Sequence, residues 1–177
     1  GGSMITNFRD FLEYIKADRI DITLKERLLR EHSYYIRKYI ILLRVDELLT
    51  NSSHLFSLPL KVLVRRKRNK LGMKLGFTIS PNVLGKGIKI WHYGNIVING
   101  EARLGEYCTL HGNNCIGNTG KSNDCPCIGD MVDIGSGATI IGNVKIAKGC
   151  VIGSGAVVVR SCYSENKTLV GVPAIER

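Results

Sequence analysis

Two histidines occupy positions where an imidazole ring could handle protons. His92 lies between two aromatic residues, Trp91 and Tyr93, and His111 follows in the sequence Leu-His-Gly-Asn-Asn. The ordinary pKa of imidazole lies near neutral pH, so the ring can accept or donate a proton under physiological conditions. Either ring could instead have a structural role, such as capping a turn. The surrounding sequence pattern therefore decides how these positions are interpreted.

A pair of cysteines, Cys125 and Cys127, flanks Pro126 and could in principle bind a metal or form a redox couple. Two cysteines without a second cluster of ligands are a weak metal signal, so we expect no metal and favour packing within a loop. Several of the chain's six cysteines lie at positions that the repeat described next makes interior. We therefore expect free, reduced thiols.

Aliphatic residues recur every six positions in the second half of the chain. A small or β-branched residue follows each of them by four positions. A β-solenoid has this period because each six-residue unit forms one flat face and a corner, with the aliphatic side chain pointing inward. Glycine, which suits tight corners, is concentrated in the same half. The aliphatic positions are Ile128, Ile134, Ile140, Ile146, Ile152 and Val158, and the small positions are Val132, Ala138, Val144, Cys150, Ala156 and Cys162.

The repeat extends backward to Ile98 and is interrupted twice. Two extra residues lie between Ile90 and Ile98, in the stretch that contains His92. The second interruption follows Ile116, where residues 118–126 are polar, contain Gly and Pro, and predict an exposed loop. Binding and catalytic sites are often built where a rigid scaffold has a local exception, so we expect function at these two places.

The first part of the chain predicts helices. Apolar residues recur at helical spacing from Asn7 to Ala17 and from Thr23 to Thr50. Thr23 has Glu26 three residues later, which is the pattern of a capping box. A third helix is predicted from Pro59 to Leu71, ending before Gly72. The predicted organisation is a tag remnant (residues 1–4), an α-helical region (5–71) and a β-helix domain (72–177).

The formal net charge of the chain is +10, and most of the excess lies before residue 71. The segment 61–74 is especially basic. Such a cluster is compatible with solvated charge, an anionic membrane surface or a polyanionic cofactor such as coenzyme A. Nucleic acid is disfavoured because no aromatic interleaving or recognised module accompanies the charge. A peripheral membrane contact stays open, and packing of a helix onto the next domain is favoured over it.

No apolar run is long enough to span a bilayer, and no signal-peptide pattern is present. We therefore expect a cytoplasmic protein. The basic segment 61–74 leaves open a location at the inner face of the membrane.

Three segments and the Ile-Gly-x-x-x-x repeats together resemble one known family. The segments are Gly87–Ile98, Gly117–Lys121 and the ending Gly171–Ala174. They resemble the serine acetyltransferase-like branch of the hexapeptide-repeat acyltransferases, over roughly residues 72–175. The resemblance implies a mainly β protein with a left-handed parallel β-helix, an exception to right-handed crossovers. It also implies a homotrimer with active sites between neighbouring subunits.

The resemblance further implies roles for single residues. The histidine that matches His92 accepts the proton of the acceptor hydroxyl, which then attacks the thioester of acetyl-CoA. Trp91 and Tyr93 become candidates for stacking on a sugar acceptor, and His111 either faces the acceptor site or lies on the ordinary surface. Small residues would let the pantetheine arm lie against the coil. The predicted coenzyme A contacts are Asn118, Thr119, Gly120, Lys121, Ser136 and Ser154.

The groups expected for free serine are missing. Trp91 stands where serine acetyltransferases have a carboxylate before the histidine, Asp124-Cys125 stand in place of an Arg-His pair, and Thr78 falls where a carboxylate orients the imidazole. Proteins of bacterial capsule and exopolysaccharide clusters resemble this chain at Gly76–Pro81 and His92–Asn99. We therefore predict an acetyl-CoA-dependent O-acetyltransferase that acts on a sugar hydroxyl of a surface polysaccharide or its precursor.

Two alternatives stay open. The first is a serine O-acetyltransferase of cysteine biosynthesis with an altered pocket. The second is a non-catalytic β-helix that binds partners through its basic helical face.

Overall fold

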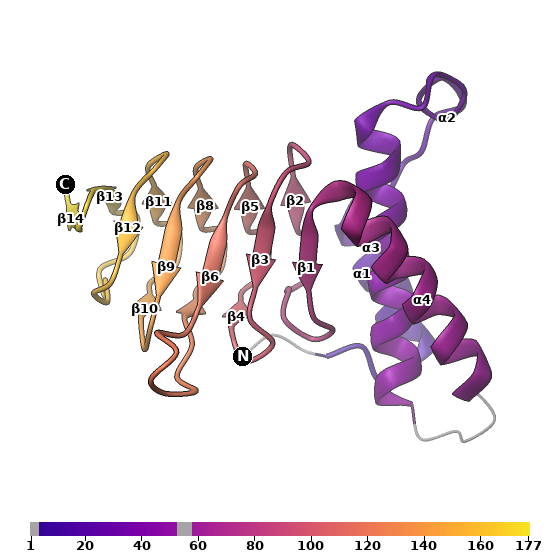
Figure 1. Cartoon of the computed structure of the whole chain (residues 1–177), viewed down its shortest axis with the longest axis horizontal. Helices are drawn as coiled ribbons and strands as arrows, with labels where there is room; N and C mark the ends of the chain where they lie inside the picture. Colours follow the sequence, from indigo (N-terminus) through magenta and orange to yellow (C-terminus); the bar gives the residue numbers. More distant parts are fainter. Residues whose placement is uncertain (1–3, 53–57) are drawn as a thin grey trace.

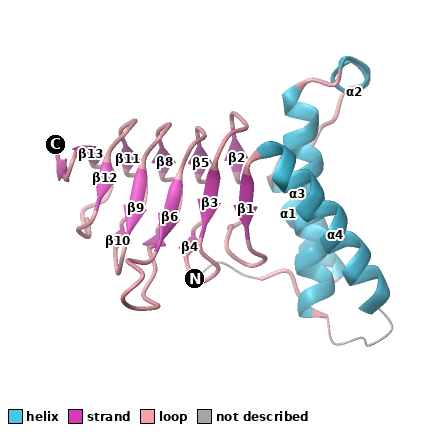
Figure 2. Cartoon of the chain, in the orientation of Figure 1, coloured by secondary structure: helices cyan, strands magenta, loops and turns pink. Residues whose placement is uncertain are grey.

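The helices lie at one end of an elongated molecule and the strands form the rest (Figures 1 and 2). The computed structural model describes residues 4–52 and 58–177. Residues 1–3 of the predicted tag remnant lie outside the described residues. The helices are α1 (Phe8–Ala17), α2 (Leu24–Leu29), α3 (His32–Asn51) and α4 (Leu58–Leu75).

The predicted helix from Thr23 to Thr50 is in fact two helices. The capping box is confirmed, since the Thr23 side chain accepts from the Glu26 backbone and the Glu26 side chain accepts from the Thr23 backbone. Helix α2 ends after six residues because Arg30 adopts a left-handed conformation with φ of 52°. The backbone N–H of Glu31 then closes the helix by donating to the Glu26 carbonyl at 3.0 Å. Sequence periodicity continued across this break and concealed it.

Helix α4 continues through Gly72 to Leu75, so the prediction that it ends before Gly72 is wrong. Gly72 permits close packing. A Cβ atom there would lie 2.7 Å from the carbonyl oxygen of Phe77 and 3.1 Å from Cε2 of Tyr39. The glycine therefore allows the end of α4 to lie against the first strand.

Parallel strands form three sheets, and the chain visits each sheet in turn (Figure 1). Sheet A is β1 (Phe77–Ile79), β3 (Ile96–Ile98), β6 (Cys115–Gly117), β9 (Thr139–Ile141) and β12 (Val157–Val158). Sheet B is β4 (Arg103–Leu104), β7 (Cys127–Ile128) and β10 (Lys145–Ile146). Sheet C is β2 (Lys89–Ile90), β5 (Thr109–Leu110), β8 (Asp133–Ile134), β11 (Val151–Ile152), β13 (Thr168–Gly171) and β14 (Ala174–Glu176). Among the strands of the described residues, only β13 and β14 pair antiparallel.

The register of the sheets confirms the six-residue repeat. Ile98 pairs with Ile116, and Ile116 pairs with Ile140, so equivalent residues of successive coils stack on one another. Every predicted aliphatic and small interior position is buried. The apolar core continues from the coils into Tyr39 and Leu43 of α3, so one core crosses the predicted domain boundary.

The cysteines are all free thiols, as predicted. Cys108, Cys150 and Cys162 are buried at small interior positions. Burial raises the pKa of the Cys108 thiol to about 11, because the thiolate would lose its hydration.

A buried ionic cluster joins the helices to the first coil. Arg44 of α3 is fully buried and pairs with Asp18 at 2.9 Å and with Glu47 at 3.0 Å. Its guanidinium also donates to the carbonyls of Leu84 and Gly85, both at 2.8 Å. These contacts fix the orientation of α3 against the first coil.

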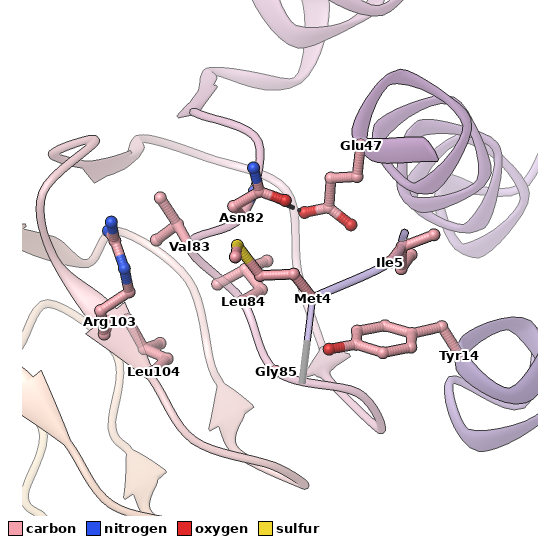
Figure 3. A pocket seen from close by; sticks show the side chains of 10 residues that line it. All are labelled: Met4, Ile5, Tyr14, Glu47, Asn82, Val83, Leu84, Gly85, Arg103 and Leu104. Carbon is pink, nitrogen blue, oxygen red and sulfur yellow. Dashed lines mark hydrogen bonds between the residues drawn. The ribbon is translucent and has the colours of Figure 1, made fainter. Parts of the chain in front are cut away.

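A pocket of about 320 Å³ lies at this junction (Figure 3). Met4, Tyr14 and Glu47 face Leu84 and Leu104 across it. Glu47 already accepts a hydrogen bond from the backbone of Asn82 at 2.8 Å. None of the predicted site residues lines this pocket.

The basic segment 61–74 belongs to α4, which packs along α3. Two of its arginines are engaged there: Arg65 and Arg68 both pair with Asp46 of α3, at 3.1 and 2.7 Å. Part of the basic segment therefore packs against α3, whereas most of the apolar residues beside it, for which packing onto the next domain was expected, are exposed. Within residues 4–52 and 58–177, no helix has the length and apolarity needed to cross a membrane.

Candidate active site

The corner between β2 and β3 contains His92 and the two extra residues that interrupt the repeat. It lies beside the helices and is hydrogen-bonded to the end of α4. The Gly94 N–H donates to the Leu75 carbonyl and the Ile96 N–H donates to the Gly76 carbonyl, both at 2.9 Å. The side chain of His92 is exposed. The inserted residues therefore form a projecting corner whose backbone is held firmly.

A histidine of the helical region, His32, stacks on this corner. Its ring centroid lies 6.0 Å from that of His92, with an angle of 29° between the planes. The same ring lies 6.2 Å from that of Tyr93. The sequence analysis missed His32, because it is the first residue of α3 and the break before that helix was not foreseen. No local sequence signal links it to His92.

Among the described residues, no carboxylate lies within hydrogen-bonding distance of the His92 ring. Thr78, where the resemblance would place an orienting carboxylate, lies on β1 in register with Val97. The Asn99 side chain, seven residues after His92, accepts a hydrogen bond from the backbone of Glu101 at 3.0 Å. His32 is thus the side chain that the structure brings into ring contact with His92.

His111 has the carboxylate partner that His92 lacks. Its Nε2 lies 2.7 Å from Oδ1 of Asp133, the residue on the adjoining strand of sheet C. The ring also lies 6.3 Å from Trp91. The ammonium of Lys89 sits 3.8 Å from the centroid of the Trp91 ring, a cation–π contact. Trp91 therefore faces sheet C with His111, whereas Tyr93 faces the helices.

The two predicted serines lie on the same edge of the β-helix as His92. A Cβ added at Gly112 would lie 3.5 Å from Cβ of His92, so Gly112 lies next to His92 at the corresponding corner of the following coil. The Gly137 N–H then donates to the Gly112 carbonyl at 3.0 Å, and the Gly155 N–H donates to the Ser136 carbonyl at 2.9 Å. Ser136 and Ser154 are both exposed. One edge of the β-helix thus presents His92, Gly112, Ser136 and Ser154 on four successive coils.

The other predicted coenzyme A residues lie at the opposite edge of sheet A. Asn118 and Thr119 follow β6, whereas Ser136 precedes the paired strand β9. Three-residue strands separate the two edges by roughly 10 Å. The loop is exposed over residues 119–124, whereas Pro126 at its end is buried. Its own side chains shape it, since the Lys121 N–H donates to Oγ1 of Thr119 at 3.3 Å. The structure of one chain therefore does not bring Asn118, Thr119, Gly120 and Lys121 together with His92.

The chain resembles proteins named serine acetyltransferase in both sequence and structure. It is 34% identical over 122 residues to that of Synechococcus elongatus, a match that covers 67% of this chain and 50% of the relative. The soybean serine acetyltransferase complexed with serine superposes with a TM-score of 0.72 at 28% identity, over 94% of this chain and 68% of that one. The Neisseria gonorrhoeae enzyme in complex with serine gives a TM-score of 0.69 at 26% identity, over 96% and 70%. No family model matches.

This chain spans about half the length of the curated relatives it matches. These likenesses support the hexapeptide-repeat acetyltransferase family and the predicted class of acetyl-CoA-dependent acyltransferase. They do not support the capsule and exopolysaccharide branch. The prediction of a polysaccharide acceptor is wrong, because the relatives are named for serine. The absence of the expected serine-binding groups is thus not a reliable guide to the acceptor.

Proposed function

We propose that this chain transfers the acetyl group of acetyl-CoA to the hydroxyl of serine, forming O-acetylserine and coenzyme A. The observation that carries the proposal is the likeness to proteins named serine acetyltransferase, which extends over the coils that contain His92. O-Acetylserine formation would fit a role in cysteine biosynthesis.

His92 is the proposed general base. Its neutral imidazole accepts the hydroxyl proton of serine as the hydroxyl oxygen forms a bond to the thioester carbonyl carbon. The tetrahedral adduct then breaks its carbon–sulfur bond, and the departing thiolate takes the proton from the imidazolium. The exposed corner suits this work, because substrate can reach the ring from solvent. Trp91, Tyr93 and His111 are proposed for the acceptor side of the site.

The proposed coenzyme A surface includes both edges of sheet A. Ser136 and Ser154 would lie along the pantetheine arm, and the loop Asn118–Lys121 would supply the remaining contacts. Since the two groups lie on opposite edges of one chain, a second subunit placing its loop beside the corner of the first would unite them. We therefore propose a homotrimer of left-handed β-helices. Its mass by light scattering should be three times the 19.6 kDa of the chain.

The proposed activity is tested by incubating the protein with acetyl-CoA and L-serine. Free thiol release gives the rate, and mass spectrometry identifies O-acetylserine. We expect turnover that depends on serine and is abolished in His92→Gln. Thiol release without O-acetylserine, or equal rates in wild type and variant, would contradict the proposal.

A cytoplasmic location stays a prediction, and no observation supports a contact between segment 61–74 and a membrane.

A further inference from the structure

A second hollow lies directly beside the corner of His92, between that corner and the helices. It has a volume of about 510 Å³, a size typical of small-molecule sites. Arg30 and His32 line it from the α2–α3 break, Tyr35 from α3, and Tyr93 from the corner. Helix α4 contributes Lys74 and two leucines. Segments far apart in the sequence thus converge on one hollow next to the proposed base.

The hollow is positively charged. Arg30 and Lys74 supply a guanidinium and an ammonium, and no described acidic residue lines it. Glu31, which lies between Arg30 and His32 in the sequence, does not line the hollow, and Glu26 of α2 is engaged by Arg37 at 2.8 Å and by the Thr23 backbone at 2.9 Å. An anion entering this hollow would therefore meet two cations without a competing carboxylate on the wall.

The N-terminus of α3 adds to this field. The helix is 20 residues long, and its N-cap, Glu31, makes no side-chain capping hydrogen bond. The first residue of the helix, His32, lines the hollow. The positive end of a helix dipole favours a negatively charged group placed close to it.

The hollow lies close to the proposed base, His92. His32 and Tyr93 both line it, and the ring of His32 lies 6.0 Å from that of His92. Serine is a short molecule, in which only Cβ and Cα separate the hydroxyl from the carboxylate group. A serine whose hydroxyl approaches His92 can therefore direct its carboxylate toward this hollow.

We propose that this hollow binds the carboxylate of the acceptor amino acid, with Arg30 and Lys74 as the residues that determine specificity. The inference rests on the proposed serine acetyltransferase function and deepens it. It accounts for a departure in the sequence: the Arg-His pair expected before Pro126 is replaced by Asp124 and Cys125. The helical region supplies the missing positive charge from the other side of His92.

The backbone conformation of Arg30 permits a substitution that removes its charge without straining the fold. With φ of 52°, Arg30 occupies the left-handed region, where glycine is less strained than any residue with a side chain. Arg30→Gly therefore removes the guanidinium while relieving strain, so a loss of serine binding is not explained by unfolding. Lys74→Met removes the second charge and keeps most of the aliphatic stem. Lys67→Met, an exposed lysine of the same helix that does not line the hollow, is the matched control.

The experiment measures KM for L-serine and for acetyl-CoA, and compares L-serine with L-serinamide, which lacks the negative charge. Each lost charge-assisted hydrogen bond should raise the serine KM by about tenfold, with an unchanged KM for acetyl-CoA. The preference of the wild type for serine over serinamide should fall in Arg30→Gly and disappear in the double variant. Arg30→Lys should retain most of it, and Lys67→Met all of it.

The outcomes separate the two proposals. Wild-type protein that forms no O-acetylserine would overturn the proposed function. Normal turnover by the wild type, with an unchanged serine KM and unchanged preference over serinamide in the double variant, would overturn the assignment of the hollow alone. An equal rise of the serine KM in Lys67→Met would also overturn it, by showing a general effect of charge.

Discussion

His92 and His111 differ in the side chains that contact their rings, and this difference bears on which of them accepts the proton. The ring of His111 is held by Asp133 at 2.7 Å, whereas the ring of His92 packs against His32. A carboxylate partner usually fixes the tautomer and orientation of a catalytic imidazole. By that criterion alone His111 would look like the base. The repeat interruption and the family resemblance point instead to His92.

Single variants of the two histidines distinguish these assignments. We expect His92→Asn to lower kcat by about 10²- to 10⁴-fold, the usual contribution of a general base. His111→Asn and Asp133→Asn should lower kcat by no more than about a few-fold and act mainly on the serine KM, because His111 is proposed to contact the acceptor rather than to accept its proton. Steady-state kinetics with saturating acetyl-CoA gives the comparison. A larger loss in both His111→Asn and Asp133→Asn than in His92→Asn would assign the base to the His111–Asp133 pair.

The residues of the corner could be predicted from sequence, and the residues that complete it could not. Two extra residues in a strict six-residue period mark His92 because they must project from the coil. His32 and Arg30 precede that corner by some sixty residues, and only the docking of α3 on the first coil brings them there. Their own surroundings in the sequence are ordinary for a helical segment.

Among the elements, the short helix α2 depends on its capping box. Hydrogen bonds from the Thr23 backbone and from Ser33, with further help from Arg37, lower the pKa of Glu26 to about 2. A carboxyl group whose pKa is lowered by folding stabilises the fold above its ordinary pKa of 4.5, and that contribution is lost as the pH falls toward 2.

Glu26→Gln should therefore destabilise the protein at pH 7 and have little effect at pH 2. The measurement is the midpoint of urea unfolding, followed by circular dichroism, for wild type and variant at each pH. Glu165→Gln, at an exposed site far from α2, serves as the control and should not shift the midpoint at either pH. A destabilisation of Glu26→Gln that stays constant from pH 7 to pH 2 would disagree with this account.

Gly72 in α4 gives a second test at this scale. In an exposed helix, Gly→Ala stabilises by about 1 kcal/mol because alanine has the higher helix propensity. Here the added methyl would lie 2.7 Å from the Phe77 carbonyl oxygen, so we expect Gly72→Ala to lower the free energy of unfolding by about 1–3 kcal/mol. Lys67→Ala, on the exposed face of the same helix, should change it by less than about 0.5 kcal/mol. A stabilised Gly72→Ala variant would show that α4 does not pack as described.

The elements also show where sequence patterns succeed and fail. The coils were predictable in detail, because an aliphatic residue every sixth position has no competing explanation. The helix ends were less predictable, because two residues contradict local sequence rules. Gly72 lies inside a helix, and Arg30, a large residue, occupies a left-handed cap. Tertiary packing decides both, and packing partners are not visible in a local pattern.

At the scale of the whole molecule, the helical region and the coils share one core and one buried ionic cluster. Tyr39 and Leu43 extend the apolar core into α3, and Arg44 links α3 to Asp18 and to the first coil. The proposed site lies along this same junction, because His32 reaches His92 only when α3 is docked. Stability of the junction and geometry of the site should therefore change together.

Arg44→Met tests this coupling. The substitution leaves Asp18 and Glu47 without their cation in a buried setting, and breaking such a pair costs about 3–5 kcal/mol. Arg65→Met is the matched control. Arg65 is 41% exposed, and its partner Asp46 keeps Arg68 at 2.7 Å, so we expect a loss below about 1 kcal/mol. Unfolding is measured by urea titration at one protein concentration, since association shifts the apparent stability.

If the junction unites the molecule, helical circular dichroism and the fluorescence of Trp91 should lose their signals in a single transition in the wild type. That transition should move to lower urea in Arg44→Met, and activity should be lost over the same range of urea concentration. Trp91 reports on the coil, because it lies on the corner after β2. Two separate transitions in the wild type would mean that the helices and the coils fold independently. An Arg44→Met variant that matches Arg65→Met in both stability and activity would mean that the site does not need the docked helices.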